Sequence, residues 1–560
     1  MNVAEAVGQA LVTLGVRQVF GLLGSGNFAV TNALVEFGAT FAAARHEGGA
    51  ITMADAYARV TGEVGICTVH QGPGLTNTIT GLTEAAKSRT PLVLLAADTA
   101  ASAIRSNFKI EQEALVRAVR AGTERLHSPA SAVADTVRAY RRAQVERRPI
   151  VLMLPLDVQA APCPEAPYLT DGHALTAHPA PVLLPACPAH AAVAQATDIL
   201  ARACRPLIIA GRGAVLANAG EALQQLGASL GALLATSANG HGLFAGSPWS
   251  LGISGGFAAP GAAELIAEAD VVLAVGAGLN MWTTRHGRLV SPNAAIIQVD
   301  HEADAIGAHH RVDVALVGDA AEAVQAIILE LERRAQGQGR GRSGWRSLGV
   351  AARIQEGGWK TAPYQDAGTA THIDPRTLSI LLDDILPDAR TVAVDSGHFM
   401  GYPAMYLRVP DAPGFVFTQA FQAVGLGLAS AIGAAVARPD RLTVAALGDG
   451  GLMLALPELE TVARLGLRML LVVYNDAAYG AEVHHFQPQG HPVNLVQFPD
   501  VDFAGLARAA GLGAATVRCP TDLEAVRQWL EGDGKPALLV DAKVVPTVVA
   551  EWLEEAFRGH

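Results

Sequence analysis

Short apolar runs recur along the whole chain, and glycine, proline or aspartate bounds most of them. Between them lie segments of helical length that are rich in Ala, Leu and Glu. Short uninterrupted apolar runs are typical of strands buried on both faces, and their alternation with helices predicts parallel sheets. The predicted fold class is therefore doubly wound α/β. The runs are Val64–Val69, Pro91–Ala97, Ile150–Leu156, Leu207–Ala210, Val271–Val275, Ala295–Val299, Thr391–Val394, Leu442–Leu447, Met469–Tyr474 and Ala537–Val540.

Two stretches interrupt this alternation. Residues 161–190 are dense in Pro, Ala and His, and residues 333–372 contain the string QGQGRGRSG near their start. Both patterns predict interdomain linkers. They leave three segments of domain size, 1–165, 190–332 and 373–546, which suits a chain of 560 residues because a single hydrophobic core does not extend so far.

Composition excludes several classes of function. The net charge of −11, without a cluster of Lys or Arg, argues against nucleic acid and anionic membranes as partners. The five cysteines have no CxxC spacing, so neither a disulfide framework nor a zinc site is indicated. Residues 1–16 resemble an amphipathic helix interrupted by Glu5 rather than a signal peptide. The uncharged stretch 415–437 contains polar residues that favour burial in protein over a membrane span, so we expect a cytoplasmic protein.

The most informative string covers residues 447–480. One apolar strand ends at the Gly-Asp-Gly-Gly turn of residues 448–451, and the next ends at Asn475 and Asp476. Carboxyl ends of neighbouring parallel strands meet at one edge of a sheet, so Asp449 and Asp476 are expected to converge. Carboxylate and carbonyl oxygens suit a hard divalent cation, and glycine N–H groups can approach a diphosphate. A Gly-Asp-Gly turn alone is common, and the second strand end makes the pattern specific.

This segment resembles the thiamine-diphosphate motif, in which GDG is followed by nearly thirty residues that end in Asn-Asn. The resemblance implies that Asp449, the residue at 476 and the backbone carbonyl of Ala478 hold Mg²⁺. Family members usually have Asn as the second ligand, whereas this chain has Asp476, which adds a negative charge. Whether Asn475 or Asp476 is the ligand stays open, although the spacing favours Asp476.

The N-terminal part supplies a second feature of the same family. The string AARHEGGAITMADAYAR places Glu47 before two glycines and a helix-like run, and VHQGPGLTN follows the next strand. In the family, a glutamate at the position of Glu47 hydrogen-bonds the pyrimidine ring of the cofactor and assists removal of the thiazolium proton. A carboxyl in a dry pocket suits this task. The alternative is an ordinary acid at a helix N-terminus, favoured by the helix dipole.

The resemblance covers the whole chain. Residues 1–165 are similar to the pyrimidine-binding domain, 190–332 to the central Rossmann-like domain and 373–546 to the diphosphate-binding domain of acetolactate synthase relatives. It implies a homodimer or homotetramer with active sites between subunits, in which Glu47 of one chain faces Asp449 of another. Acetolactate synthases also bind FAD in the central domain, where Gly211–Gly213 and Val275–Asn280 lie in suitable turns. Such turns occur in any Rossmann-like domain, so FAD is left open.

Further cofactor contacts follow from the resemblance. In the string AVGLGLASAIGA, Val424 matches the apolar residue that bends the cofactor, where Met or Leu is commoner. A diphosphate-contacting turn is matched at 396–398, although His398 has the alternative of a surface loop histidine. The predicted cofactor-binding residues are Glu47, Ser396, Gly397, His398, Val424, Gly448, Gly450, Gly451 and Tyr479.

Residues expected near the reacting carbon give a mixed picture. Ser25 and His70 match a catalytic Ser and His of benzoylformate decarboxylase-type enzymes, and Glu482 matches a second glutamate of pyruvate decarboxylase-type enzymes. Gln112 matches a glutamine that acetolactate synthases hold near the reaction intermediate. The alternatives are a strand-end histidine for His70 and a helix-face acid for Glu482, while the histidines at 484 and 485 are more typical of packing.

The sequence therefore predicts a thiamine-diphosphate-dependent carboligase or decarboxylase that acts on 2-oxoacids, with or without a carbonyl acceptor, and is acetolactate synthase-like. Alternatives are a benzoylformate decarboxylase-like enzyme that does not ligate, a non-decarboxylating carbon–carbon lyase and an acetyl-transferring relative. An inactive regulatory paralogue would be expected to have lost Glu47 or the GDG turn, and both are present. A dinucleotide-binding oxidoreductase is disfavoured because no strand is followed by a complete GxGxxG.

Overall fold

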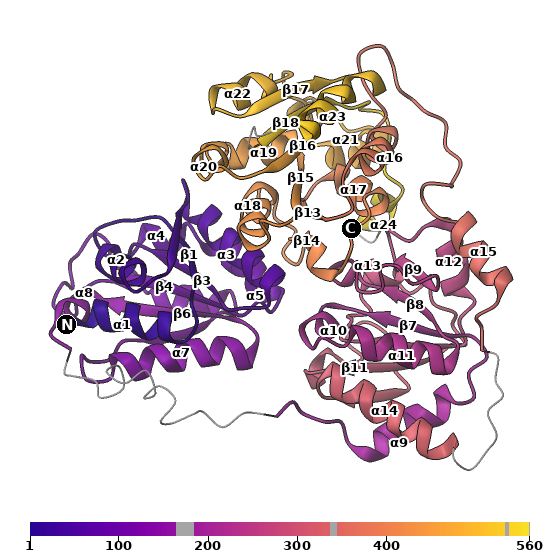
Figure 1. Cartoon of the computed structure of the whole chain (residues 1–560), viewed down its shortest axis with the longest axis horizontal. Helices are drawn as coiled ribbons and strands as arrows, with labels where there is room; N and C mark the ends of the chain where they lie inside the picture. The colour runs from indigo at the N-terminus through magenta and orange to yellow at the C-terminus, as the bar shows by residue number, and fades with distance from the viewer. Residues whose placement is uncertain (164–183, 336–343, 533–536, 559–560) are drawn as a thin grey trace.

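The computed structural model describes residues 1–163, 184–335, 344–532 and 537–558. These residues form three α/β domains, each built on a parallel sheet of six strands (Figure 1). In Figure 1 the first domain, in indigo, lies at the left, the central domain lies at the lower right, and the third domain, in orange and yellow, lies above the central one. The predicted doubly wound α/β fold class is confirmed.

The first domain has the strand order β2-β1-β3-β4-β6-β5. The predicted N-terminal helix is α1, and Glu5 stabilises its first turn rather than interrupting it, because Glu5 and the N-cap residue Asn2 form a reciprocal capping box with distances of 2.8 and 2.9 Å. The elements are α1 (Val3–Thr13), β1 (Gln18–Gly21), α2 (Phe28–Glu36), β2 (Thr40–Ala43), α3 (Glu47–Thr61), β3 (Gly65–Val69), α4 (Pro73–Thr76), α5 (Ile79–Lys87), β4 (Leu92–Asp98), α6 (Gln112–Ala118), β5 (Gly122–Arg125), α7 (Ala132–Glu146), β6 (Pro149–Pro155) and α8 (Leu156–Ala160).

The central domain has the strand order β12-β11-β10-β7-β8-β9, which is the doubly wound order of dinucleotide-binding folds. Its elements are α9 (His190–Leu200), β7 (Pro206–Ala210), α10 (Arg212–Leu216), α11 (Gly220–Leu230), β8 (Leu233–Thr236), β9 (Ser250–Ile253), α12 (Pro260–Ala267), β10 (Val271–Val275), α13 (Met281–Thr284), β11 (Ala295–Asp300), β12 (Val314–Val317), α14 (Ala320–Ala335) and α15 (Leu348–Glu356).

The third domain has the order β14-β13-β15-β16-β18-β17, the same as the first domain when strands are counted within each. Its elements are α16 (Pro375–Ile385), β13 (Arg390–Val394), α17 (Gly401–Tyr406), β14 (Phe415–Phe417), α18 (Gly427–Ala437), β15 (Leu442–Gly448), α19 (Asp449–Ala455), α20 (Glu458–Arg464), β16 (Met469–Asn475), α21 (Gly480–Phe486), α22 (Phe503–Ala509), β17 (Gly513–Val517), α23 (Glu524–Glu531), β18 (Ala537–Lys543) and α24 (Trp552–Phe557).

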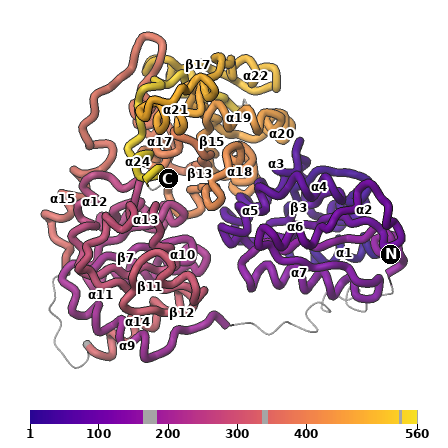
Figure 2. The backbone as a smooth tube through the Cα atoms, turned by 180° about the vertical axis from the view of Figure 1, so that it is seen from behind, coloured from indigo at the N-terminus to yellow at the C-terminus, as the bar shows by residue number. Residues whose placement is uncertain are grey.

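Helices α3 and α18 join the first and third domains and lie side by side in both views (Figures 1 and 2). Their backbones approach so closely that a side chain at Gly433 would clash with the Met53 carbonyl. Glycine is required there by space. The uncharged stretch 415–437 thus folds as β14 and α18, which is buried against α3. In the described part of the chain, no helix has both the length and the apolar character needed to cross a membrane.

The two predicted linkers have different outcomes. In the first, residues 164–183 lie outside the described residues, and α9 begins at His190. The second is not a simple linker, because it contains the end of α14 and the whole of α15. Trp345 and Val350 from this segment are buried in the core of the central domain. Apolar burial, which a polar composition does not reveal, is the reason that Trp345 and α15 pack against the central domain.

His241 lies between the central and third domains and makes folding sensitive to acid. Its ring packs edge-on against Phe415 with centroids 4.9 Å apart, and its Nε2 has no partner among the described residues. Burial lowers the pKa of His241 to about 4. In the unfolded chain the histidine has a pKa of about 6.5, so it takes up a proton before the folded chain does as the pH falls. The stability that neutral His241 contributes is therefore fully present above about pH 6.5 and is lost as the pH falls towards 4.

We expect the wild-type free energy of unfolding to fall by about 2 kcal/mol more between pH 7 and pH 5 than that of His241→Phe. Phenylalanine keeps the packing against Phe415 and cannot be protonated. Urea denaturation of both proteins at the two pH values measures the difference. Equal losses in the two proteins would contradict the role of His241.

Candidate active site

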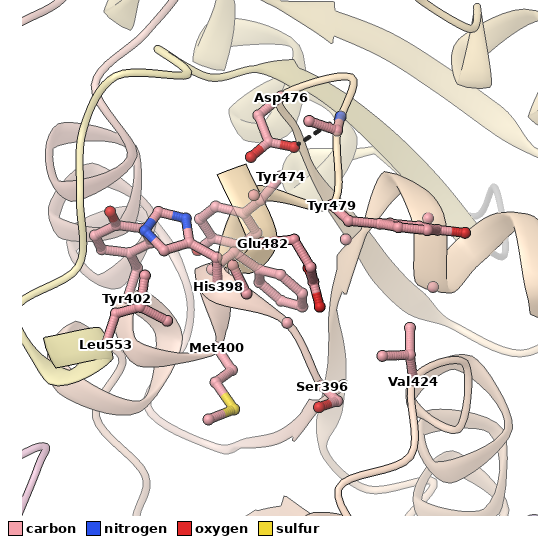
Figure 3. Close-up of a pocket in the computed structure, with 18 of the residues that line it drawn as sticks. Ser396, His398, Met400, Tyr402, Val424, Tyr474, Asp476, Tyr479, Glu482 and Leu553 are labelled. Carbon is pink, nitrogen blue, oxygen red and sulfur yellow. Dashed lines mark hydrogen bonds between the residues drawn. The ribbon is translucent and has the colours of Figure 1, made fainter. Parts of the chain in front are cut away.

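A cavity of about 610 Å³ lies at the carboxyl ends of β13, β15 and β16 (Figure 3). Most of its wall belongs to the third domain, while Met281 and Trp282 come from the central domain and α24 closes one side. All the residues predicted for cofactor and metal in the C-terminal part line it, together with Glu482. They are Ser396, Gly397, His398, Val424, Gly448, Asp449, Gly450, Gly451, Asp476, Ala478, Tyr479 and Glu482.

Asp449 and Asp476 are brought together in this cavity. Asp449 is the first residue of α19, at the end of β15, and Asp476 follows β16 directly. Burial raises the pKa of both carboxyls, and the charge of Asp449 raises that of Asp476 further. Two buried carboxylates that repel each other in this way are stabilised by a cation between them.

The donor set fits magnesium. No three His, Cys, Asp or Glu side chains form a possible metal site within the described ranges. A cation here would therefore take a backbone oxygen besides the two carboxylates, and the Ala478 residue that the resemblance implies lines the same cavity. Mixed carboxylate and carbonyl oxygens are ligands that Mg²⁺ and Ca²⁺ accept.

Asn475 faces away from the cavity. Its Nδ2 donates to Asp541 Oδ1 at 2.9 Å, and its Oδ1 accepts the N–H of Ala477 at 3.1 Å. Ala477 has a left-handed backbone with φ of 55°, an unfavourable conformation for a residue with a Cβ. Asp476 Oδ1 accepts the Ala478 N–H at 3.2 Å. Of the two residues that the sequence left open, only Asp476 lines the cavity.

The glycines of the 448–451 turn are required by space. A Cβ at Gly450 would lie 2.6 Å from Cε1 of Tyr479, and one at Gly451 would clash with the Asp395 carboxylate. Without these side chains the first turn of α19 keeps its backbone N–H groups accessible. This cradle fits the diphosphate of the predicted cofactor.

Asp395 organises the cradle, although the sequence analysis assigned it no role. It follows β13, is fully buried, and accepts the N–H groups of Gly425 at 3.0 Å and Leu426 at 3.2 Å. Burial raises its pKa to about 6. These bonds hold the turn that follows Val424 against the cradle. The available signal was an aspartate directly after an apolar strand, in VAVDSG.

His398 is buried in the wall and is not a surface histidine. Its Nε2 accepts the Ala550 N–H at 2.9 Å, and its ring centroid lies 4.4 Å from that of His484. Burial lowers the pKa of His398 to about 3, so the ring is neutral and carries its proton on Nδ1. His398 therefore provides a neutral polar surface.

Glu47 is the first residue of α3 and is 8% exposed. Its Oε2 accepts a hydrogen bond from Asn77 Nδ2 at 2.9 Å. The chain just before it is held by Glu458 of the third domain, whose Oε1 accepts the N–H groups of Arg45 at 3.0 Å and His46 at 3.1 Å. Glu458, which the sequence analysis did not identify, thus fixes the entry to α3.

His70, Ser25 and Gln112 lie in the first domain. His70 Nδ1 accepts the Gly26 N–H at 3.0 Å, so the neutral ring carries its proton on Nε2, which has no partner among the described residues. Burial lowers the pKa of His70. Ser25 is exposed in the adjoining turn. The Gln112 amide is used within the domain, because it accepts the N–H of residue 72 at 2.9 Å and donates to the carbonyl of residue 97 at 3.0 Å.

None of these four N-terminal residues lines the 610 Å³ cavity. Every described residue in its wall comes from position 281 onwards. A single chain therefore keeps the two predicted halves of the site apart.

A buried ion network connects the halves structurally. Arg59 Nη2 donates to Asp55 at 2.7 Å and to Glu84 at 2.9 Å, and Nη1 donates to the Phe417 carbonyl at 3.1 Å. Glu84 Oε2 accepts the Phe421 N–H at 2.7 Å. The bonds to the Phe417 carbonyl and from the Phe421 N–H cross from the first to the third domain, so they fix the loop that carries Val424.

Two further cavities, of about 460 and 290 Å³, lie between the three domains. The turns considered for FAD contribute Arg212 and Gly276 to both of them. Arg212 Nη2 is enclosed without a partner among the described residues, and burial lowers the Arg212 pKa to about 9. An enclosed, unpaired guanidinium nitrogen is suited to an anionic group.

Comparison with known proteins assigns the three domains to one family. Three parts of the chain match thiamine pyrophosphate enzyme domains: residues 1–117 match the N-terminal TPP binding domain, 193–327 the central domain and 395–540 the C-terminal TPP binding domain.

Three relatives cover nearly the whole chain. A probable 2-ketoarginine decarboxylase of Pseudomonas aeruginosa is 32% identical over 93% of this chain and 91% of its own length. The acetolactate synthase isozyme 2 large subunit of Escherichia coli is 28% identical over 96% and 95%. The sulfoacetaldehyde acetyltransferase of Castellaniella defragrans is 29% identical over 92% and 88%. The activities that their names give differ, although the chains are similar throughout.

Proposed function

The chain belongs to the thiamine pyrophosphate enzyme family, and from this premise we propose that it makes or breaks the carbon–carbon bond beside the carbonyl of a 2-oxoacid. The observation that carries the proposal is the meeting of Asp449, Asp476 and the glycine cradle in one cavity with Glu482. The preferred activity is an acetolactate synthase-like carboligation or decarboxylation. A decarboxylase that releases an aldehyde without ligation is the alternative.

Thiamine diphosphate, when bound, would supply a nucleophilic carbon for the ketone and an acceptor for the electron pair left by CO₂. Asp449, Asp476 and the Ala478 carbonyl would hold Mg²⁺, and the N–H groups of the 449–451 turn would contact the diphosphate. Val424, with an exposed fraction of 43% in the single chain, has its surface available for the cofactor.

Glu47 serves a site completed by a second copy of the chain. In that site it shares a proton with the pyrimidine ring at the far end of the cofactor. Large exposed apolar surfaces mark protein contacts, and this chain has them beside both halves of the site. They comprise Leu23, Phe28, Ile104, Phe108 and Ile110 in the first domain, and Phe421, Val424, Met453, Leu454, Tyr479 and Phe498 in the third. We therefore propose a homodimer or a larger homo-oligomer.

The fate of the decarboxylated intermediate depends on proton donors near the reacting carbon. The Glu482 carboxylate has no hydrogen bond or ion pair with the described residues, and Glu482 lines the cavity. In the half of the site that a second chain contributes, the corresponding group is His70, whose neutral ring carries its proton on an Nε2 that is unpaired among the described residues. Both are titratable groups that can relay a proton, which favours aldehyde release, whereas a carbonyl acceptor near Gln112 and Ser25 favours ligation.

The cavities beside Arg212 keep FAD as a possible structural cofactor in the proposal. Arg212 and Lys87 would face its phosphates.

The experiment uses purified protein with thiamine diphosphate, Mg²⁺ and a panel of 2-oxoacids, with and without aldehyde acceptors. We expect CO₂ release and, with acceptors, a ligated product. Replacement of Glu482 by Gln or His70 by Ala is expected to change the ratio of aldehyde to ligated product, because each change removes a titratable group that can relay a proton. An unchanged ratio would contradict their roles. No CO₂ and no new product from any acid would reject the function.

A further inference from the structure

We propose that the substrate of this site carries a cationic side chain, so that it is a 2-oxoacid ending in a guanidino or amino group. The inference rests on the proposed function, because it names the substrate class of the same cavity. It is carried by the charges of the cavity wall and by the directions in which the neighbouring cations point.

The described wall of the cavity is acidic. Its carboxylates are Asp449, Asp476 and Glu482, and it contains no Lys or Arg among the residues that the structure describes. A divalent cation balances the two aspartates, and the diphosphate then adds further negative charge. The Glu482 carboxylate is unpaired among the described residues, and Figure 3 shows it directed into the open space between Ser396 and Val424. The wall that this chain contributes is therefore acidic around Glu482.

Three arginines on segments that adjoin the wall are held away from it. Arg376, next to Pro375 of the wall, pairs with Asp374 at 2.6 Å. Arg285, on the turn after α13, donates to the carbonyls of residues 255 and 258 at 2.9 and 3.1 Å. Arg288 pairs with Glu555 on the side of α24 that does not line the cavity. None of them is available to neutralise an anionic side chain.

The remaining wall suits a long aliphatic stem with a positive end. The indoles of Trp282 and Trp552 lie 5.9 Å apart, and Phe557 and Leu553 extend the apolar surface. Aromatic faces attract cations, and apolar walls accommodate the methylene stem of a guanidino group.

Glu482 separates cationic from aromatic substrates. A guanidinium can donate to its carboxylate, which has no partner among the described residues. An aromatic side chain would fill the apolar wall but leave that carboxylate without a partner. A carboxylate or sulfonate would be repelled by Glu482.

The test compares four 2-oxoacids of similar length, whose common 2-oxoacid group cancels in the comparison. They end in a guanidino group, a methyl group, a phenyl ring and a carboxylate. We expect kcat/KM for the guanidino acid to exceed that for the methyl and phenyl acids by at least about tenfold, and that for the carboxylate acid by more. Equal or higher values for the phenyl or carboxylate acid would overturn the inference.

Met281→Lys places a positive charge in the same wall on an unbranched stem of similar length, and Met281→Leu is its matched control. We expect the lysine variant to lose at least about tenfold of the preference for the guanidino acid over the carboxylate acid, and the leucine variant to keep it. Equal preferences in both variants would contradict the electrostatic explanation.

Binding is measured separately with 5-guanidinopentanoate, octanoate and suberate, which have no oxo group to react. Calorimetry with the cofactor-loaded enzyme gives their affinities. The expected order places the guanidino compound first and suberate last. If this order holds and no 2-oxoacid releases CO₂, the proposed function is wrong while the charge preference stands. If CO₂ is released without this order, the charge preference is wrong while the function stands.

Discussion

Glu47→Gln is expected to lower kcat by about 10²- to 10⁴-fold for every 2-oxoacid, while the oligomer still binds thiamine diphosphate and Mg²⁺. Glutamine keeps the size of the side chain and can still accept from Asn77, whose Nδ2 lies 2.9 Å from Glu47 Oε2. It cannot share a proton with the pyrimidine ring. Steady-state kinetics and calorimetry measure the two effects. Glu36→Gln, which changes an exposed acid of the same domain, is the control.

Mixing subunits tests whether Glu47 acts across an interface. In a mixed dimer of Glu47→Gln and Asp449→Ala chains, one site contains both changes and the other contains neither. Random exchange makes half of the dimers mixed, so about a quarter of the wild-type activity should return. If Glu47 and Asp449 of one chain served the same site, every site would carry one change and no activity would return. The result therefore decides between a shared and a single-chain site.

The strands that the sequence predicted are those buried on both faces. All ten predicted apolar runs coincide with strands, because burial on both sides of a parallel sheet requires continuous apolar residues. The missed strands are short or polar and depend on a neighbour. The edge strand β5 has the sequence GTER and exists through its pairing with β6, and β17 pairs in the same way with β18. Pairing over long sequence distances leaves no local pattern.

The site residues likewise fall into those that a local sequence pattern predicts and those that depend on distant parts of the chain. Asp449, Asp476 and the glycine turn were predictable, because strand ends on one edge converge whatever the rest of the chain does. Asp395 and Glu458 were not, because their roles consist of hydrogen bonds to backbone groups that are far away in sequence. Trp552 likewise reaches the cavity from the last helix. Residues that position the chemistry thus depend on the folded chain, whereas residues that carry charge at strand ends do not.

Asp449→Ala is expected to weaken Mg²⁺-dependent binding of thiamine diphosphate by at least about a hundredfold, with loss of product formation. Removal of this carboxylate leaves Asp476 and a backbone carbonyl as the protein ligands. Calorimetry with increasing Mg²⁺ measures the change, and excess EDTA on the wild type should reproduce it. Asp388→Asn, at an exposed position of the same domain, is the control.

Asp476→Asn is expected to behave differently from Asp449→Ala. An amide oxygen can still bind the cation, so activity at saturating Mg²⁺ should stay within about tenfold of the wild type. The site loses one negative charge, however, and half-saturation should need more Mg²⁺. Unchanged Mg²⁺ dependence in both variants, or tight cofactor binding after EDTA, would show that these carboxylates hold no metal. A larger effect of Asp476→Asn than of Asp449→Ala would make Asp476, after β16, the main metal ligand instead of Asp449, at the start of α19. The cation depends most on the carboxylate that a neutral oxygen cannot replace.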